Sequence, residues 1–224
     1  MSHKIRVSIL DDHQSIIDGY RYRLSRADRV QVVATACFGE ALEPMLAEHP
    51  TDVLLLDMQV PTSPENNNPY PVPQTIPRLL QAYPTLSILI ISMHAKRPMI
   101  RTVMEAGASG YILKDDGQTI QHLEEVILAV AGGDIYLSQA ADELYDPGEG
   151  SALTPRQLEV LSLFAAYPNH TSASVALKLE VAHSTVRNLL SEAYMRLGVR
   201  NRSAAILKAQ ELGLIPPATV AYDP

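Results

Sequence analysis

Residues 53–61 read VLLLDMQVP, a short apolar run that ends at a single carboxylate, Asp57. A run of this length is typical of a buried strand and is too short for a helix. The same arrangement occurs at residues 5–12, IRVSILDD, where a strand-like segment ends at Asp11 and Asp12. Two buried strands that each end in carboxylates indicate a sheet with an acidic edge.

Short apolar runs and amphipathic segments alternate over the first 130 residues, which is typical of βα units around a parallel sheet. Five strands are predicted, at 5–10, 30–36, 53–56, 87–91 and 110–113. Helices are predicted between them, most clearly at 14–24, 41–48, 97–106 and 119–131. The fold class of this part is therefore α/β, with a doubly wound parallel sheet.

A second, all-helical part follows. Residues 132–151, with Gly, Pro and acidic residues clustered near their end, are predicted to be a linker. Behind them, Thr154 is the expected N-cap of a helix, with Pro155 at its first position and Gln157 able to close a capping box. Helices are predicted at 155–166, 172–179, 183–197 and 202–212. The sequence thus predicts domains at 1–131 and 152–224.

The composition fits folded domains and gives no sign of a membrane protein. The chain has 224 residues, of which 46% are hydrophobic and 19% charged, and no run approaches the roughly 20 apolar residues that span a bilayer. The start, MSHKIRVSIL, leads into the first strand instead of a signal peptide. We therefore expect a cytoplasmic protein with no membrane partner.

The net charge of −7 is divided unevenly along the chain. Residues 1–150 carry 11 Lys and Arg against 20 Asp and Glu, a net charge of −9, whereas residues 151–224 carry 7 against 5, a net charge of +2. A mildly positive second domain is compatible with contact to phosphates, although it is less basic than a strongly basic nucleic-acid-binding module.

The carboxylates at the strand ends predict a ligand site. In an open parallel sheet, ligands bind beyond the carboxyl ends of the strands, and Lys114 follows the fifth strand. If strands one, three and five are neighbours, Asp11, Asp12, Asp57 and Lys114 share one crevice. Carboxylates so close raise one another's pKa unless a cation neutralises them, and Mg²⁺ prefers such oxygen ligands. Asp57 can then act as a nucleophile and form an aspartyl phosphate.

Four segments resemble the receiver domain of two-component response regulators, over about residues 4–131. They are Ile9-Leu10-Asp11-Asp12-His13, Leu55-Leu56-Asp57-Met58-Gln59-Val60-Pro61, Ile90-Ile91-Ser92-Met93-His94 and Gly110-Tyr111-Ile112-Leu113-Lys114. The resemblance implies a (βα)5 flavodoxin-like fold with Asp57 as phosphoacceptor.

The same resemblance implies a role for each polar residue of the crevice. Asp12, Asp57 and the Gln59 carbonyl would bind Mg²⁺, with Asp11 assisting through water. Lys114 would pair with the phosphoryl group, Ser92 would move to hydrogen-bond it, and Tyr111 would rotate inward behind Ser92.

Residues 153–215 resemble the four-helix helix-turn-helix domain of the NarL/LuxR/FixJ group. The resemblance rests on Leu153-Thr154-Pro155-Arg156, Glu159-Val160-Leu161, Val175-Ala176, Leu179, Ser184-Thr185-Val186-Arg187-Asn188 and Leu197-Gly198-Val199 with Asn201-Arg202. It implies a recognition helix that starts near Ser184 and enters the major groove.

The residues expected to contact DNA follow from this placement. The exposed face of the recognition helix carries Arg187, Asn188 and Ser191, and Arg and Asn suit guanine and adenine edges. Thr185, Arg200 and Arg202 are better placed for phosphates. Glu192 adds a negative charge to this helix. The last helix offers Ile206, Leu207 and Leu212 either as a dimer seam or for packing within the domain.

Together the resemblances imply a response regulator that acts on transcription. A partner histidine kinase would phosphorylate Asp57 and so switch homodimerisation and binding to a palindromic DNA site. Such a chain is not an enzyme, although it accepts phosphate and slowly loses it. A rival hypothesis is a phosphorylation-gated protein-interaction switch with weak or no sequence-specific DNA binding, favoured by the acidic total. A dehalogenase-type phosphatase is disfavoured, because its second acid would stand where Gln59 is.

One segment departs from the receiver pattern. Residues 62–73 read TSPENNNPYPVP, several residues longer than expected after the phosphoacceptor strand, and their prolines favour a stiff extended path. The segment either shields the acyl phosphate or meets a partner, or it is an ordinary surface insertion.

Overall fold

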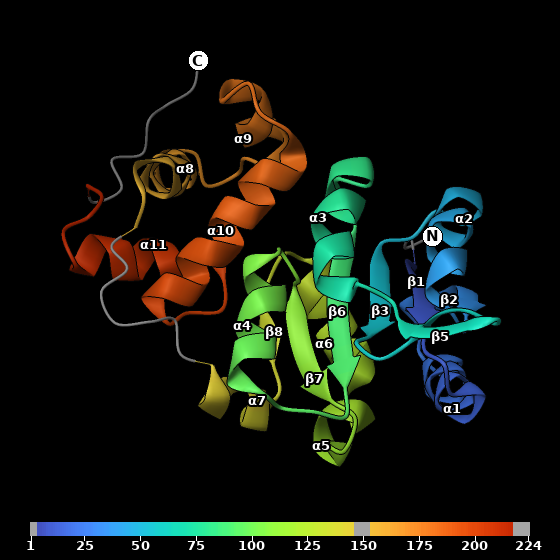
Figure 1. Ribbon diagram of the computed structural model, residues 1–224. Coiled ribbons are helices and arrows are strands. Elements are labelled where there is room, and N and C mark those ends of the chain that lie inside the picture. Colours follow the sequence, from blue (N-terminus) through green and yellow to red (C-terminus); the bar gives the residue numbers. More distant parts are fainter. Residues whose placement is uncertain (1–3, 146–152, 217–224) are drawn as a thin grey trace. The chain divides into compact units, whose positions relative to one another are not determined.

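The computed structural model describes residues 4–145 and 153–216, and its contacts divide the chain into two compact units (Figure 1). Among the described residues, the first unit comprises 4–79 and 86–145, and the second comprises 80–85 and 153–216. Within the described ranges, no helix is both long and apolar enough to cross a bilayer. The cytoplasmic location stays a prediction.

A six-stranded parallel sheet forms the centre of the first unit, in the order β2-β1-β3-β6-β7-β8. The strands are β1 (Ile5–Leu10), β2 (Val30–Ala36), β3 (Val53–Asp57), β6 (Ser87–Ser92), β7 (Gly110–Leu113) and β8 (Tyr136–Leu137). The five predicted strands are confirmed to within one residue at each end. The central strands β3 and β6 are buried along their whole length, which is why they are apolar runs without alternation.

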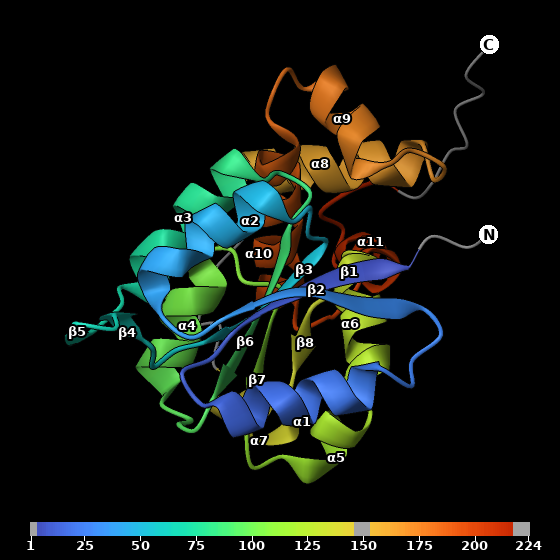
Figure 2. The ribbon, with the colours of Figure 1, turned by 90° about the vertical axis from the view of Figure 1, so that its right-hand side faces the viewer.

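Helices cover both faces of this sheet, as predicted for a doubly wound fold. They are α1 (Gln14–Leu24), α2 (Leu42–Glu48), α3 (Val72–Ala82), α4 (Arg97–Glu105), α5 (Gly117–Gln121) and α6 (Leu123–Ala131). On one face, Ile17 of α1 and Val126 of α6 pack against Val7 and Leu55. Figure 2 shows α2, α3 and α4 on the other face. The helix predicted at 119–131 is two helices, which meet at His122.

The linker predicted at 132–151 is wrong over its first part. Residues 132–145 contain the edge strand β8 and helix α7 (Gln139–Leu144), and both belong to the first unit. Strand β8 can pair with β7 because Gly110 has no side chain, since a Cβ there would lie 2.4 Å from the Tyr136 carbonyl oxygen. The Ser138 main-chain N–H donates to the Tyr111 carbonyl at 3.0 Å. The remaining linker residues, 146–151, lie outside the described residues.

The insertion at 62–73 is also more ordered than the predicted extended path. It forms an antiparallel hairpin of β4 (Pro61–Ser63) and β5 (Asn66–Pro69), and α3 begins at Val72. The Tyr70 ring occupies the space that a side chain at Gly39 would need, with Cδ2 2.0 Å from an ideal Cβ. Gly39 opens η1 (Gly39–Ala41), the short 3₁₀ turn before α2. The base of the hairpin is therefore packed onto the β2–α2 connection.

Four helices form the second unit, and their predicted bounds are confirmed to within one residue. They are α8 (Pro155–Ala166), α9 (Ser172–Lys178), α10 (His183–Leu197) and α11 (Arg202–Glu211). The predicted capping box is present, because Thr154 accepts from the Gln157 N–H and the Gln157 side chain accepts from the Thr154 N–H. Between α9 and α10, Glu180 adopts a left-handed conformation with φ of 53°. This arrangement is the predicted helix-turn-helix.

Candidate functional site

The acidic residues of the first unit meet at the carboxyl edge of the sheet. Asp11 and Asp12 follow β1, and Asp57 is the last residue of the neighbouring strand β3. Asp11 and Asp57 are only 2% and 4% exposed. Main-chain N–H groups donate to both carboxylates, from His13 to Asp11 Oδ1 at 3.0 Å and from Gln59 to Asp57 Oδ1 at 3.2 Å. Local turns thus hold the two carboxylates in place.

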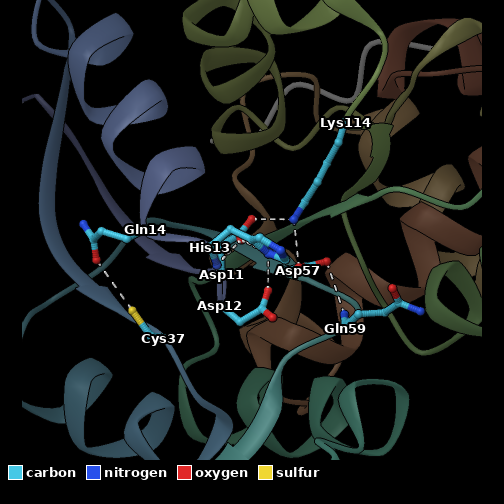
Figure 3. A network of polar contacts seen from close by, with 8 residues as sticks. All are labelled: Asp11, Asp12, His13, Gln14, Cys37, Asp57, Gln59 and Lys114. Atoms are coloured by element: carbon cyan, nitrogen blue, oxygen red, sulfur yellow. Dashed lines mark hydrogen bonds and ion pairs between the residues drawn. The ribbon is translucent and has the colours of Figure 1, made fainter.

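Lys114 bridges these two carboxylates (Figure 3). Its Nζ lies 2.7 Å from Asp11 Oδ2 and 2.8 Å from Asp57 Oδ2, and its side chain is 5% exposed. The expectation that strands one, three and five are all neighbours is wrong, because β6 lies between β3 and β7. Lys114 nevertheless reaches Asp57, since its long side chain crosses the end of β6.

Burial and ion pairing oppose each other in this crevice. Burial raises the pKa of Asp57 above its usual value, although the hydrogen bond from Lys114 lowers it in part. For Lys114, burial alone would lower the pKa, but the hydrogen bonds to Asp11 and Asp57 outweigh it and the pKa is raised. Lys114 therefore stays protonated at neutral pH, and its positive charge offsets only part of the effect that burial has on Asp57.

The donor set of the crevice fits a divalent cation. One carboxylate oxygen from each of Asp11, Asp12 and Asp57 and one ring nitrogen of His13 all lie within 4.8 Å of one another. Oxygen-rich clusters of this kind suit Mg²⁺. His13 was not among the predicted site residues. Its Nδ1 lies 2.6 Å from Asp12 Oδ1, and the signal for it was its position directly after the two aspartates.

Two of the three predicted switch residues, Ser92 and Tyr111, lie next to each other behind the crevice, and the third is Lys114. Ser92 ends β6, is 1% exposed and accepts a hydrogen bond from the His94 N–H at 3.2 Å. Tyr111 of β7 is fully buried, and its hydroxyl donates to the His94 carbonyl at 2.5 Å. Burial raises the pKa of Tyr111, which keeps this hydroxyl protonated. Tyr111 is thus already in the inward position that we expected phosphorylation to produce.

The second unit places the predicted DNA-contacting residues on two elements. Thr185, Arg187, Asn188 and Ser191 all lie on α10, the second helix of the helix-turn-helix. Arg200 follows Gly198, which ends α10 in a left-handed conformation with φ of 66°. Their roles toward DNA stay predictions.

Arg202 is held inside the second unit, which argues against its predicted role at phosphates. Its Nη1 donates to the His170 carbonyl at 3.1 Å, and its guanidinium carbon lies 4.7 Å from the centre of the Phe164 ring. The connection between α8 and α9, residues 167–171, contains His170 and is also packed. The centre of the Tyr167 ring lies 4.9 Å from that of His170 and 3.7 Å from Lys178 Nζ. Arg202 thus ties α11 to this connection.

Glu192 also has a partner within the second unit. The fully buried Gln157 side chain donates from Nε2 to Glu192 Oε2 at 2.8 Å, while its Oε1 accepts from the Thr154 N–H at 2.9 Å. The carboxylate expected to weaken contact with DNA is therefore directed at the start of α8. No pattern in the sequence could indicate this contact, because α8 and α10 are 35 positions apart at these residues.

Comparisons with known proteins agree with both units. Residues 7–125 match the model of the response regulator receiver domain, and residues 151–209 match that of bacterial regulatory proteins of the luxR family. The probable transcriptional regulatory protein NarL of Mycobacterium tuberculosis H37Rv is 29% identical over 220 residues, 95% of this chain and 96% of that protein. The transcriptional regulatory protein DesR of Bacillus subtilis is 27% identical over 210 residues, 93% and 98% of the two chains.

Solved structures of one regulator resemble the chain over nearly its whole length. The response regulator RcsB of Salmonella typhimurium is 26% identical with a TM-score of 0.56. The match covers 95% of this chain and 100% of the RcsB chain. RcsB of Salmonella enterica serovar Typhimurium bound to the promoter rprA, in the presence of the phosphomimetic BeF3-, is 25% identical with a TM-score of 0.54, over 93% and 100% of the two chains.

Proposed function

Because the chain belongs to the response regulators, with a receiver domain followed by a luxR-family domain, we propose that phosphorylation of Asp57 controls its action on transcription. The observation that carries this proposal is the bridge from Lys114 to Asp11 and Asp57. It places a buried ammonium beside a buried carboxylate, where an added phosphoryl group would need a positive partner.

We assign the divalent site to Asp11, Asp12 and Asp57 together with the Gln59 carbonyl, and the ion to Mg²⁺. The clustered carboxylate oxygens support this assignment. When bound, the ion neutralises the crevice and allows the Asp57 carboxylate to approach a phosphoryl donor. A histidine kinase is the proposed donor. The chain performs no other reaction than accepting this phosphate and slowly losing it to water.

The proposed switch follows from the added charge. A phosphoryl group brings roughly −1.5 to −2 charges and three acceptor oxygens. Lys114 lies 2.8 Å from Asp57, and Ser92 ends the neighbouring strand β6. The conformation that brings both donors to the phosphate is therefore favoured. Because Ser92 ends β6 and Tyr111 lies behind it, the β6–α4 connection is the segment that shifts.

The proposed output is a homodimer bound to a palindromic DNA site. Arg187, Asn188 and Ser191 would read base edges, and Thr185 and Arg200 would contact phosphates. The negative charge of Glu192 is compatible with DNA binding by α10, because its carboxylate accepts a hydrogen bond from Gln157 within the second unit. The related structure of RcsB bound to a promoter in the presence of a phosphomimetic supports this proposed output.

DNA protection with genomic fragments tests the proposal. We expect wild-type protein treated with acetyl phosphate or beryllofluoride to protect specific fragments at least tenfold better than untreated protein. Asp57→Asn should lose the difference, whereas Asp18→Asn, which removes an exposed carboxylate of α1, should keep it.

Two results would contradict parts of this scheme. An Asp57→Asn protein that still took up radiolabelled phosphate and dimerised like the wild type would remove the assignment of Asp57. Absence of binding to any DNA at low salt, with phosphorylation intact, would replace transcription regulation by the rival protein-interaction switch.

A further inference from the structure

An open cavity lies at the surface of the first unit, on the outer side of α1. It has a volume of about 370 Å³ and is lined by Gly19, Tyr22, Arg23, Arg26 and Gln121, all exposed. The first four come from α1 and the turn after it, and Gln121 comes from α5. Because a helix rises 1.5 Å per residue, Arg23 lies roughly 13 Å along α1 from its start beside the crevice. The cavity shares no residue with the carboxylate cluster.

The arginines of this cavity have no acidic partners, although the domain is strongly acidic. Other arginines of the unit are paired with carboxylates, namely Arg6 with Asp52 at 2.7 Å and Arg78 with Glu43 at 2.8 Å. Over residues 4–145, no carboxylate is within ion-pair distance of Arg23 or Arg26. Two like charges three positions apart also repel each other. An anionic ligand would relieve this repulsion.

The helix dipole explains why a cation is favourable at Arg23 but not at Arg26. Arg21 and Arg23 lie in the last turn of α1, where a cation is favourable. Arg26 lies beyond Ser25, the C-cap residue, and its guanidinium carbon is 4.7 Å from the centre of the Tyr22 ring. Its Nη2 also donates to the Tyr22 hydroxyl. Tyr22 thus holds the Arg26 guanidinium at the cavity independently of the helix terminus.

We propose that this cavity binds the phosphoryl groups of a small anion such as pyrophosphate or a nucleoside diphosphate. A guanidinium presents a planar set of donors that pairs with phosphate through two parallel hydrogen bonds. Two such groups match a ligand with two or more negative charges, and the Gln121 amide adds a donor from a second element. The volume is within the range of about 300–1,000 Å³ for ligand sites. Tyr22 is 62% exposed, and a base can stack on the face of its ring that Arg26 does not cover.

Calorimetry with full-length, metal-free protein tests the proposal, because phosphates then have no metal ion to bind in the crevice. The probes are pyrophosphate, ADP and adenosine. We expect pyrophosphate and ADP to bind with one ligand per chain at millimolar concentration and adenosine not to bind. Arg23→Gln and Arg26→Gln should each weaken binding at least tenfold. Arg21→Gln is the matched control, because it removes the same charge from the same helix but lines a different cavity.

The outcomes distinguish a nucleotide ligand from a ligand that binds through its phosphoryl groups alone, and they show which results overturn the proposal. ADP binding much tighter than pyrophosphate would identify a nucleotide site with stacking on Tyr22, and equal affinities would identify a site for the phosphoryl groups alone. Absence of binding by both would overturn the proposal. So would an equal loss of affinity in Arg21→Gln and Arg26→Gln, which would indicate diffuse attraction by the whole helix.

Discussion

At the scale of single residues, Lys114 decides the electrostatics of the crevice. Its ammonium is the buried cation that contacts both Asp11 and Asp57. Taking one partner from a buried ion pair leaves charge without compensation, which costs far more than losing a surface pair.

We expect Lys114→Met, which keeps the length of the side chain, to lower the free energy of unfolding by about 3–5 kcal/mol in metal-free buffer. Mg²⁺ should restore part of this loss, because a bound cation can take over neutralisation of the carboxylates. Urea unfolding with and without Mg²⁺ measures both effects, and Lys96→Met at an exposed position is the control. A Lys114→Met protein as stable as the wild type without metal would disprove the bridging role.

Glu192 is the residue whose role differs most between sequence and structure. We expect Glu192→Ala to lower the free energy of unfolding by about 1–3 kcal/mol, because the buried amide of Gln157 loses its acceptor. Glu159→Ala is the control, since its exposed pair with Arg156 is worth about 1 kcal/mol or less. If instead Glu192→Ala left stability unchanged and strengthened DNA binding, the carboxylate would face DNA after all.

At the scale of elements, β8 is one of the additions that the sequence pattern did not indicate. Its two residues extend the sheet beside the strand that carries Tyr111, and the Tyr136 hydroxyl lies 3.0 Å from Thr119 Oγ1 of α5. β8, which precedes the second unit in the sequence, is thus hydrogen-bonded to β7 and α5, the elements next to the crevice.

Gly110→Ala tests how β8 is held. The new Cβ would lie 2.4 Å from the Tyr136 carbonyl oxygen and 2.7 Å from Leu89 Cδ1, so β8 should be displaced at a cost of about 1–3 kcal/mol. We expect faster hydrogen exchange at the Tyr136 and Ser138 amides. Gly117→Ala, where an added Cβ meets no atom within 4 Å, should exchange like the wild type. Unchanged protection at both amides in Gly110→Ala would show that the pairing of β8 with β7 does not depend on the absence of a side chain at position 110.

The start of α5 gives a pH-dependent prediction. The main-chain N–H and the hydroxyl of Thr119 both donate to Asp116 and hold the pKa of its carboxyl below the usual value. A lowered pKa in the folded state means that the carboxylate stabilises the fold above its unfolded pKa of about 3.9. This contribution is lost as the pH falls through the lower folded value.

We therefore expect Asp116→Ala to cost about 0.5–2 kcal/mol at pH 7, and the difference from the wild type to shrink below about pH 3.9. Unfolding by urea at a series of pH values measures it. Asp115→Ala removes the same charge one position earlier and should show little effect at any pH. A difference that grew on acidification would contradict the sign of the pKa shift.

The strands and their carboxylates could be predicted because both follow from local chemistry. A run such as VLLLD requires burial and places Asp57 at a strand end whatever the strand order. The contact of Lys114 with Asp57 depends on which strands are adjacent, and the assumed adjacency was wrong although the contact exists. β8 escaped prediction because two residues carry no periodicity. The Gln157–Glu192 bond escaped it because helix packing alone brings these residues together.

At the scale of the whole molecule, charge is divided between an acidic receiver and a mildly basic DNA-binding part. With so few cations available, each arginine that contacts a phosphate should be visible in the salt dependence of DNA binding, because each contact releases counterions. An arginine held inside the fold should instead affect stability. Arg200, which we propose contacts a phosphate, is expected to affect the salt dependence, and Arg202, which contacts His170 and Phe164, is expected to affect stability.

Measurement of DNA affinity against salt concentration, combined with urea unfolding, separates the two roles. We expect Arg200→Gln to reduce the slope of log K against log salt by about 0.9, the value for one lost phosphate contact. Arg202→Gln should leave the slope unchanged and lower the free energy of unfolding by about 1–3 kcal/mol, because His170 and Phe164 lose their partner. A reduced slope in Arg202→Gln at unchanged stability would return Arg202 to the DNA interface that the sequence predicted.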